Sequence, residues 1–485
     1  MISRGTLPAP PRASADTIFA PASGIGRAAV AVIRISGERS HEIMRALTPG
    51  SLPAPRRASL RKLVDPATHE VIDEAIVLWM PGPGTFTGED QLEFQIHGSL
   101  AVRAALLRAL ADLPGCRAAE PGEFTRRAFL NGRMDLTAVE GLADLINAET
   151  ETQRRQALRQ FEGGLGRKVE AWRESLVEAL AACEAALDFA DEDDVPADVA
   201  ANSAAAAAGV RGEIERALAD AVRGERVRDG FQVVIAGPPN AGKSTLLNAL
   251  ARRDVAIVSP IAGTTRDVIE VRCDLGGLPV TFADTAGLRE SQDMIELAGI
   301  ERARQRMERA DLVLWLKPPE RPHPEVLAEG EPRRTHDGIA DFEAGRRPAP
   351  PHEEGDSSSV PSEVLHLRVA TKSDAGRSDG ECDLAVSAKT GAGIDGLLAR
   401  IEAIAGAAMD TGSDAVLTRE RHRAILAQVG ECLDRVALAG EGSELGIELV
   451  AEDIRLALRY LGRMTGAVDV EEILDRIFTS FCIGK

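Results

Sequence analysis

Aromatic residues and cysteines are scarce in this sequence of 485 residues, and each scarcity excludes a kind of protein. Phe, Trp and Tyr make up 3% of the residues, and Tyr460 is the single tyrosine, so no platform of stacked aromatics for single-stranded nucleic acid is expected. The six cysteines are far apart and include no CxxC pair, which fits neither a zinc site nor a disulfide-rich scaffold. A reducing compartment is therefore expected.

The sequence also has no run of about twenty apolar residues, the length that is needed to span a bilayer. Residues 1–15 are rich in proline and have no apolar core, so they predict a disordered tail and not a signal peptide. Together these absences predict a cytoplasmic protein.

Positive charge is in deficit along the chain. Lys and Arg number 57 and Asp and Glu 76, and the net charge of −19 repels a polyanion at long range. Any contact with nucleic acid must therefore be local. Two basic clusters are candidates for such a contact, although solvated helix faces are the simpler interpretation of both. Their members are Arg126, Arg127 and Arg133, and then Arg154, Arg155, Arg159, Arg167 and Lys168.

The apolar pattern divides the first half of the sequence into an α+β region and a helical region. Over residues 16–132, β-like runs such as AAVAVIRI, EAIVLWM and QLEFQIHG alternate with one helical stretch, LAVRAALLRALADL. Residues 133–226 are predicted to be helical, and apolar residues at spacings of three and four indicate a helix face that packs in a core. This face consists of Val169, Trp172, Leu176, Leu180, Cys183 and Leu187.

Residues 227–406 show the succession of strand, glycine-rich loop, helix and strand that is typical of a doubly wound α/β domain. Within this domain, residues 317–361 are dense in Pro, Glu, Asp, Arg and Ser, which predicts a disordered insertion. Residues 407–485 return to amphipathic helices. We therefore expect a multidomain α/β and α+β protein in which a Ras-like P-loop domain interrupts a discontinuous helical domain.

A phosphate-binding loop is predicted at GPPNAGKS, residues 237–244, which matches GxxxxGK[ST] between an apolar strand and a helix. Lys243 is expected to reach the β- and γ-phosphate oxygens, and Ser244 to ligate Mg²⁺. Thr265 in AGTTRD offers a second hydroxyl to Mg²⁺, Asp284 in DTAG belongs to the metal shell, and the Gly287 N–H faces the γ-phosphate. The remaining expected contacts are Gly237, Asn240, Ala241, Gly242, Thr245, Thr285 and Ala286.

Two later motifs predict that the base is guanine. In TKSD, residues 371–374, the Asp374 carboxylate can accept from both the N1–H and the exocyclic amine of guanine, a pair that adenine does not present. SAK, residues 387–389, is expected to support the base from behind. The predicted base contacts are Thr371, Lys372, Asp374, Ser387, Ala388 and Lys389. These motifs, in this order, make GTP the expected ligand in preference to ATP.

Leu288 follows the DTAG glycine, at a position where most small GTPases have a glutamine that orients the attacking water. A leucine side chain cannot orient water, so another polar side chain is expected to do so from the segment that follows. The candidates there are Glu290, Asp293, Glu296 and Glu301, each of which would alone be interpreted as a solvated helix charge.

These motifs and several others resemble those of the tRNA-modification GTPase family MnmE, also called TrmE. The resemblance runs from Asp16 to the last residue, except for the insertion, and rests on VIRISG, TGEDQLEFQIHG, EPGEFTRRAFLNGRMDL, LDFADED, the GTPase motifs and FCIGK. It implies an N-terminal tetrahydrofolate-binding domain, a helical domain and an inserted G domain. It also implies a homodimer that works with a FAD-dependent partner protein of the MnmG (GidA) kind and with tRNA.

The reaction that the resemblance implies is the addition of an aminomethyl or carboxymethylaminomethyl group to C5 of the wobble uridine of certain tRNAs. The one-carbon unit comes from a tetrahydrofolate, in a methylene or 5-formyl form. By position, Arg34, Glu93, Arg133 and Lys485 would contact the folate, whose glutamate tail is anionic and whose pterin donates hydrogen bonds. The family usually has a lysine at position 133, so the positive charge is retained with a different geometry.

Two further positions are of interest beside this resemblance. Cys482, in FCIGK, is either a small buried hydrophobic residue or a redox or nucleophilic group, and the sequence leaves both open. Thr371 stands where the family usually has asparagine. Since threonine cannot make both contacts of an amide, weaker binding of guanine nucleotides is predicted.

The resemblance also implies which residue acts on the attacking water in place of the glutamine, and which ion supplies positive charge beside the phosphates. The family's glutamate at the Glu296 position acts on the water, and Asn240 matches a residue that ligates a K⁺ ion beside the phosphates. The loop SPIAGTT would complete the K⁺ site and would become ordered when two G domains meet. Its implied ligands are the carbonyls of Ser259 and Ile261, together with Thr264.

Two functions remain open at this point. The first is a GTP-hydrolysing enzyme subunit in tRNA wobble-uridine modification. The second is a regulatory GTPase switch, in ribosome assembly or signalling, that performs no covalent chemistry. The N-terminal third and FCIGK favour the first, because a switch has no need for them.

We expect GTP hydrolysis to be faster in K⁺ than in Na⁺, because the ion would replace an arginine finger, whose contribution is about 10³ to 10⁵ in rate. Asn240→Ala should erase the difference between the two salts, and Glu296→Ala should abolish turnover while GTP still binds. Phosphate release in matched KCl and NaCl buffers measures these effects. Equal rates for the unmodified protein in both salts would exclude the cation.

Overall fold

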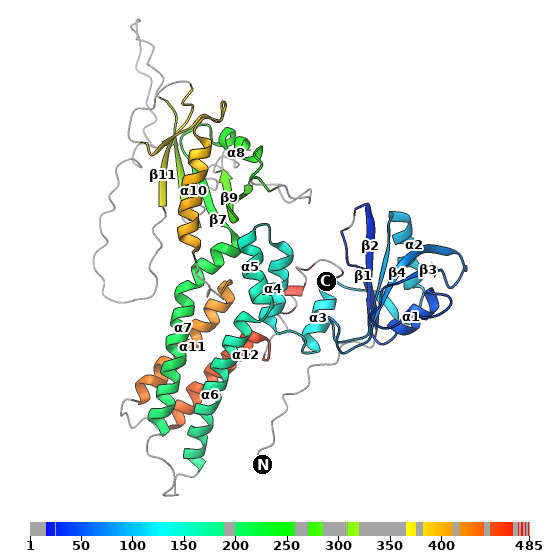
Figure 1. Cartoon of the computed structure of the whole chain (residues 1–485). Helices are drawn as coiled ribbons and strands as arrows, with labels where there is room; N and C mark the ends of the chain where they lie inside the picture. Colours follow the sequence, from blue (N-terminus) through cyan, green and yellow to red (C-terminus); the bar gives the residue numbers. More distant parts are fainter. Residues whose placement is uncertain are drawn as a thin grey trace, which may run out of the picture. The chain divides into compact units, whose positions relative to one another are not determined.

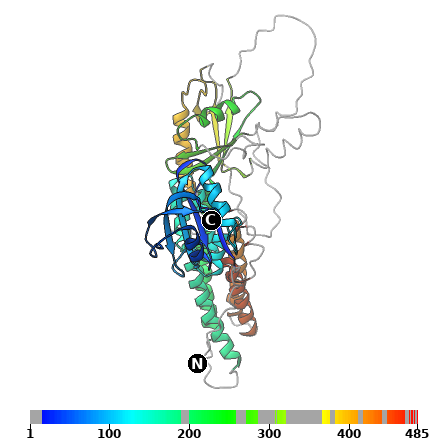
Figure 2. The ribbon, with the colours of Figure 1, turned by 90° about the vertical axis from the view of Figure 1, so that its right-hand side faces the viewer.

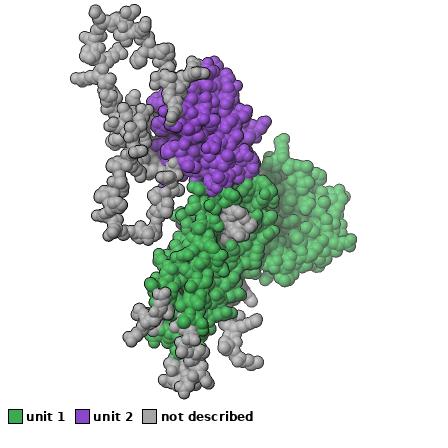
Figure 3. Space-filling view, turned by 60° about the vertical axis from the view of Figure 1, so that its left-hand side comes forward, with its two compact units in different colours: residues 1–229, 409–485 green, residues 230–408 purple. Residues whose placement is uncertain are grey.

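The structure is a computed structural model that describes residues 16–24, 26–188, 199–257, 270–284, 307, 309–319, 365–374, 382–410, 417–440, 447–468, 474, 477, 478, 481 and 484. The chain forms two compact units (Figure 3). The first consists of residues 1–229 and 409–485, and the second of residues 230–408. None of the helices within the described ranges is long and apolar enough to cross a membrane.

The first unit begins with a mixed sheet in the order β3-β4-β5-β2-β1-β6 (Figure 1). All neighbouring strands in it are antiparallel except β1 and β6. The predicted β-runs are confirmed as β2, β4 and β5, and the predicted helix as α2 (Leu100–Ala111). The strands are β1 (Thr17–Pro21), β2 (Ala28–Ser36), β3 (Ser59–Val64), β4 (Val71–Met80), β5 (Gln91–Gly98) and β6 (Cys116–Ala118).

The two faces of this sheet have different roles because strand side chains alternate in direction. One face, with Ile33, Ile35 and Phe94, packs against α1 (Ser40–Leu47) and α2 in an apolar core. On the opposite face, Ile18 and Ala20 of β1 pack against Phe124 of α3 (Glu123–Leu130). Arg34 is the cross-strand partner of Ala20, so it lies on the α3 side of the sheet.

The rest of the first unit is helical. It combines helices that precede the second unit in the sequence with helices that follow it. The helices α6, α7, α11 and α12 lie side by side in both ribbon views and in their mutual contacts (Figures 1 and 2). The predicted core face of α6 is confirmed, since Val169, Trp172, Leu176 and Cys183 are buried and Leu180 and Leu187 pack against them. The helices are α4 (Leu136–Asn147), α5 (Glu151–Phe161), α6 (Gly164–Asp188), α7 (Val199–Asp229), α11 (Glu420–Gly440) and α12 (Ile447–Thr465).

A buried ion network ties α4 to the chain that returns after residue 408. Glu140 of α4 is 3% exposed and accepts hydrogen bonds from Arg421 Nη2 at 2.9 Å and His422 Nε2 at 2.7 Å. One turn further along α4, Asp144 pairs with Arg419 at 2.6 Å. Burial alone would raise the pKa of Glu140, but the His422 hydrogen bond and the arginine charges outweigh it and lower that pKa to about 2. Burial also lowers the pKa of His422, which is neutral near pH 7.

The second unit is a sheet in the order β12-β11-β10-β7-β9-β8, parallel except for β8. The chain continues from β7 first to β8 and β9 on one side and then to β10, β11 and β12 on the other, so the order reverses at β7. Ligands of doubly wound sheets bind at the carboxyl ends of the strands at such a reversal. The elements are β7 (Phe231–Ala236), α8 (Lys243–Ala251), β8 (Glu270–Leu275), β9 (Leu278–Asp284), β10 (Leu312–Lys317), β11 (Leu365–Ala370), β12 (Leu384–Ala385) and α10 (Ile394–Met409).

The first residue of the disordered insertion predicted for residues 317–361 lies in a strand. Lys317 is the last residue of β10 and pairs with Ala370 of β11. The backbone hydrogen bonds of this parallel pairing keep Lys317 in the strand although its side chain is polar. Residues 320–364 and the tail 1–15 lie outside the described residues, so their disorder stays a prediction.

We expect Glu140→Gln to lower the thermal stability of the first unit at pH 7, at a cost of roughly 3 kcal/mol, the lower end of the range for breaking a buried ion pair. The arginines keep 21% and 19% of their side-chain surface exposed, which limits the loss. Because the pKa of Glu140 is lowered from 4.5 to about 2, its stabilisation is complete above pH 4.5 and is lost as the pH falls towards 2.

The difference in melting temperature between the two proteins should therefore shrink over that pH range, as measured by thermal unfolding with circular dichroism. Glu184→Gln is the matched control, since Glu184 pairs with Arg455 while 48% of its side chain is exposed. Equal losses in the two variants at pH 7 would contradict a special role for the Glu140 network.

Candidate functional site

The phosphate-binding loop lies at the carboxyl end of β7, the central strand of the second unit. Gly237 has a φ of 144°, and a Cβ atom at this position would lie 2.6 Å from the Leu316 carbonyl oxygen, so only glycine fits. Gly242, with a φ of 95°, is the N-cap of α8, and as a glycine it has no side chain that could cap this end of the helix. The backbone N–H groups of the first turn therefore face an open end that suits a phosphate.

Lys243 and Ser244 begin α8 and carry the polar groups of this loop. The Lys243 ammonium donates to the carbonyl oxygens of Gly237 and Pro238, at 2.8 and 3.0 Å, so it lies over the concave side of the loop. The Ser244 hydroxyl donates to Asp284 Oδ2, at 2.7 Å, and Asp284 ends β9 with 2% of its surface exposed. A hydroxyl beside a carboxylate is a pair of hard oxygen ligands that fits Mg²⁺.

The TKSD segment follows β11 and is tied to the phosphate-binding loop by two hydrogen bonds. The Thr371 hydroxyl donates to the Ala241 carbonyl at 2.7 Å, and Lys372 Nζ donates to the Asn240 carbonyl at 2.9 Å. Both Asn240 and Lys372 have positive φ, at 64° and 54°. The structure therefore brings these predicted phosphate and base contacts together, in two chain segments that side-chain hydrogen bonds join.

Asp374 and Ser387 form the second half of the expected base site. The buried Ser387 hydroxyl donates to Asp374 Oδ1 at 2.6 Å, and this hydrogen bond lowers the pKa of Asp374. The carboxylate is therefore ionised at neutral pH, and Asp374 is exposed. Two acceptor oxygens match the two donors of guanine. Ala388 and Lys389 lie in the turn directly after Ser387.

Several predicted site residues lie outside the described residues, and their roles stay predictions. Among the GTP and metal contacts these are Ser259, Ile261, Thr264, Thr265, Thr285, Ala286 and Gly287. The residues that bear on the attacking water are Leu288, Glu290, Asp293, Glu296 and Glu301, and those of the C-terminal motif are Cys482 and Lys485. Asn240 is described, and its side chain is exposed at the tip of the loop.

The predicted folate contacts Arg34 and Glu93 are cross-strand partners on β2 and β5. Arg34 Nε donates to Glu93 Oε1 at 3.1 Å, and the side chains are 25% and 16% exposed. The guanidinium also lies over the rings of Phe86 and Phe124, at 5.7 and 6.0 Å from their centroids. Among the described residues, no group accepts a hydrogen bond from the terminal nitrogens of Arg34, which leaves these donors for a ligand.

Arg133 and the C-terminal segment approach the same part of the first unit. The Arg133 methylenes lie against Gly88, where a Cβ atom would be 3.4 Å from two of them. Gly484, with a φ of 99°, lies so close to the Pro21 carbonyl that any side chain would collide with it. Pro21 follows Ala20, the cross-strand partner of Arg34. Lys485, which lies outside the described residues, is therefore one residue from this contact.

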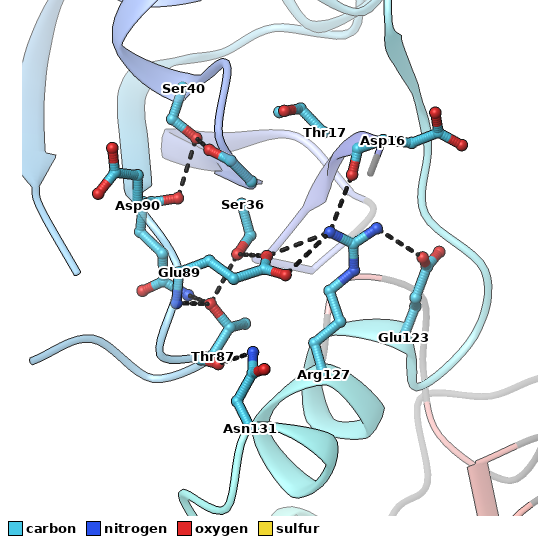
Figure 4. Close-up of polar contacts among 12 residues, drawn as sticks. Asp16, Thr17, Ser36, Ser40, Thr87, Glu89, Asp90, Glu123, Arg127 and Asn131 are labelled. Carbon is cyan, nitrogen blue, oxygen red and sulfur yellow. Dashed lines mark hydrogen bonds and ion pairs between the residues drawn. The ribbon is translucent and has the colours of Figure 1, made fainter. Parts of the chain in front are cut away.

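The sequence interpretation of Arg127 is wrong. Grouped with Arg126 and Arg133 as either a nucleic-acid contact or a solvated helix charge, Arg127 is in fact 3% exposed and pairs with Glu89 and Glu123 (Figure 4). A guanidinium in this setting is occupied by carboxylates and cannot reach a polyanion. Sequence reasoning missed the other residues of this network, which are Ser36, Thr87, Glu89, Glu123 and Asn131. All five lie in the motifs VIRISG, TGEDQLEFQIHG and EPGEFTRRAFLNGRMDL.

The second basic cluster behaves as a solvated helix face at Arg154 and Arg155. Arg154 and Arg155 on α5 both pair with Glu151, at 2.8 and 2.7 Å, and are 50% and 65% exposed. Ion pairs at spacings of three and four on a helix surface are common and weak. They give no specific indication of a nucleic-acid site.

Family models match nearly the whole chain. A model described as the GTP-binding protein TrmE N-terminus matches residues 17–133, and one described as the MnmE helical domain matches residues 136–482. The residues that the second model matches include the whole of the second unit, residues 230–408.

Similar proteins match over almost their full length. A tRNA modification GTPase MnmE from Methylobacterium sp. (strain 4-46) is 58% identical over 475 residues, which are 97% of this chain and 100% of the relative. A protein of the same name from Parvibaculum lavamentivorans is 49% identical over 470 residues, 97% and 100% of the two chains. Among solved structures, Aquifex aeolicus Era bound to GDP·AlF4⁻ is 26% identical, with a TM-score of 0.23 over 36% of this chain and 56% of that chain.

We expect Thr371→Asn to tighten GDP and GTP binding about three- to tenfold. The single hydroxyl hydrogen of Thr371 is used on the Ala241 carbonyl, whereas an asparagine amide has a second N–H for the N7 acceptor of guanine, and one hydrogen bond contributes about 0.5–1.5 kcal/mol. Thr371→Val, which removes the bond to Ala241, should weaken binding. Titration calorimetry measures both, and an unchanged affinity of Thr371→Asn would contradict this account of the base site.

Proposed function

The chain belongs to the MnmE family of tRNA modification GTPases, and on this premise we propose that it is the GTP-hydrolysing subunit of a tRNA wobble-uridine modification complex. The complex would add an aminomethyl or carboxymethylaminomethyl group to C5 of the wobble uridine of certain tRNAs. The observation that most supports this proposal is 58% identity that extends over 97% of the chain and thus includes the N-terminal sheet and the C-terminal motif. A regulatory switch would use neither of these parts.

In the proposed GTP site, Lys243 neutralises the β- and γ-phosphates, and Ser244, Thr265 and Asp284 hold or orient Mg²⁺. Asp374 reads guanine, with Ser387 fixing the orientation of its carboxylate. Mg²⁺ would supply positive charge to the phosphate oxygens during transfer. Water is activated by Glu296 because Leu288 has no polar group.

A K⁺ ion is the proposed source of the remaining positive charge. The exposed Asn240 side chain at the tip of the phosphate-binding loop offers an amide oxygen, the kind of ligand that alkali cations take. Its further ligands would be the carbonyls of Ser259 and Ile261, together with Thr264.

For the one-carbon donor, a tetrahydrofolate, we propose a site on the α3 side of the N-terminal sheet. Arg34, Arg133 and Lys485 would bind the anionic glutamate tail, and Glu93 would accept hydrogen bonds from the pterin. The Arg34–Glu93 pair supports this proposal, because each partner orients the other and the terminal nitrogens of Arg34 have no acceptor among the described residues. Cys482, three residues before Lys485 in the sequence, would be a redox or nucleophilic group of this region.

The proposed assembly follows from the same family. We propose the domains 16–132 for folate, 133–226 with 407–485 for the helical part and 227–406 for an inserted G domain. The partners would be a second copy of the chain, a FAD-dependent protein of the MnmG kind, and tRNA, in the cytoplasm.

Mass spectrometry of tRNA nucleosides tests the proposed function. Cells that lack the protein should contain tRNAs with an unmodified wobble uridine where the parent strain has the modified one, and the gene in trans should restore it. A normal nucleoside profile without the protein would favour the regulatory alternative.

Deletion of residues 481–485 should abolish tRNA modification and leave GTP hydrolysis nearly unchanged, because the described contacts of this segment are in the first unit and the GTP site is in the second. Modification is measured in a reconstituted reaction with the flavoprotein partner and folate, and hydrolysis as phosphate release. Parallel loss of both activities would contradict two separate sites.

A further inference from the structure

The side chain of Arg127 is a buried connection among three parts of the first unit (Figure 4). It projects from α3 and is 3% exposed. Its Nη1 donates to the Asp16 carbonyl at 2.9 Å and to Glu89 Oε2 at 3.1 Å, and its Nη2 donates to Glu123 Oε1 at 3.0 Å. One guanidinium therefore joins the start of β1, the segment before β5 and the helix α3.

The segment that Arg127 holds is residues 85–90, between β4 and β5. Glu89 in this segment also accepts from the Ser36 hydroxyl at 2.8 Å, and Ser36 lies 2.7 Å from the Thr87 hydroxyl. From the far end of α3, Asn131 Nδ2 donates to the Thr87 carbonyl at 2.7 Å. The segment is thus fixed from β2 by Ser36 and from the C-terminal turn of α3 by Arg127 and Asn131.

This segment lies between two of the proposed folate contacts. Phe86 presents the ring over which Arg34 lies, and Gly88 is the residue against which the Arg133 methylenes pack. A shift of residues 85–90 would therefore move the supports of Arg34 and Arg133 at once.

We propose that Arg127 is a positioning residue for the folate site, an inference that rests on the proposed function. By fixing residues 85–90, Arg127 sets the separation between Arg34 and Arg133 that a bound folate requires, and it does so without touching the folate. Contacts that hold binding groups in place contribute to affinity because a small displacement loses several hydrogen bonds at once.

The chemistry of the network requires an arginine. Glu89 and Glu123 are 17% and 10% exposed, and their two carboxylates flank one guanidinium. Burial would raise the pKa of Glu123, but hydrogen bonds from Arg117, Glu120 N–H and Arg127 outweigh it and lower that pKa, so Glu123 is ionised. A planar guanidinium donates in several directions at once, which the ammonium of a lysine cannot do in the same geometry.

The test is calorimetric titration of the full-length protein with 5-formyltetrahydrofolate. Arg127→Gln should weaken its affinity about 10- to 100-fold, the range found when residues that orient binding groups are changed. In the reconstituted modification reaction, the KM for the folate should rise while kcat and GTP hydrolysis stay nearly unchanged. Arg117→Gln is the matched control, because Arg117 also pairs with Glu123 but, among the described residues, makes no hydrogen bond or ion pair with residues 85–90, so the variant should leave folate affinity intact.

A second pair of variants separates positioning from simple loss of stability. The double variant Arg127→Gln with Glu89→Gln removes the unpaired charge, so the melting temperature should recover while folate affinity stays low. Asn131→Ala should weaken the affinity several-fold with little change in melting temperature, since it removes one bond to Thr87. Recovery of folate affinity in the double variant would overturn the proposal.

The same titrations distinguish this inference from the folate site itself. If Arg34→Ala abolishes binding and Arg127→Gln leaves it unchanged, the positioning role is wrong and the site stands. If the unmodified protein does not bind 5-formyltetrahydrofolate, the folate site and the role of Arg127 are both overturned.

Discussion

The first unit depends on the association of two chain segments that residues 230–408 separate in sequence. Apolar packing of α6 and α7 against α11 and α12 supplies most of the driving force, and the core includes Trp172, Leu176, Leu433 and Leu461 from both segments. Apolar contacts alone allow neighbouring registers, whereas Glu140 must meet Arg421 and His422 in one geometry. We infer that the ion network fixes the register of α11, the helix that follows the second unit in the sequence.

Both candidate sites are built in the same manner, from exposed binding groups whose supports are buried. In the second unit, the buried Ser387 orients the exposed Asp374, and Thr371 ties the base site to the phosphate-binding loop. In the first unit, Arg127 holds the segment on which Arg34 and Arg133 rest. Preorganised groups of this kind lose little conformational entropy when a ligand binds, which favours affinity without additional contacts.

How far the sequence predicts this structure depends on how local each interaction is. The β-runs, α2 and the core face of α6 follow from apolar periodicity, and the strand-loop-helix context of Gly237 follows from local residue types. Arg127 was misinterpreted because its partner Glu89 is 38 residues away, and no local pattern distinguishes a buried arginine from a solvated one. The bond from Thr371 to Ala241 spans 130 residues and depends on strand order, which residue spacing does not reveal.

In the proposed function, GTP turnover in the second unit drives a modification whose one-carbon donor binds in the first unit. Nucleoside mass spectrometry of tRNA from cells in which Lys243→Ala replaces the unmodified protein tests this claim most directly. The account predicts an unmodified wobble uridine in those cells, although the purified variant binds 5-formyltetrahydrofolate with unchanged affinity. A normal content of the modified nucleoside in those cells would contradict the account.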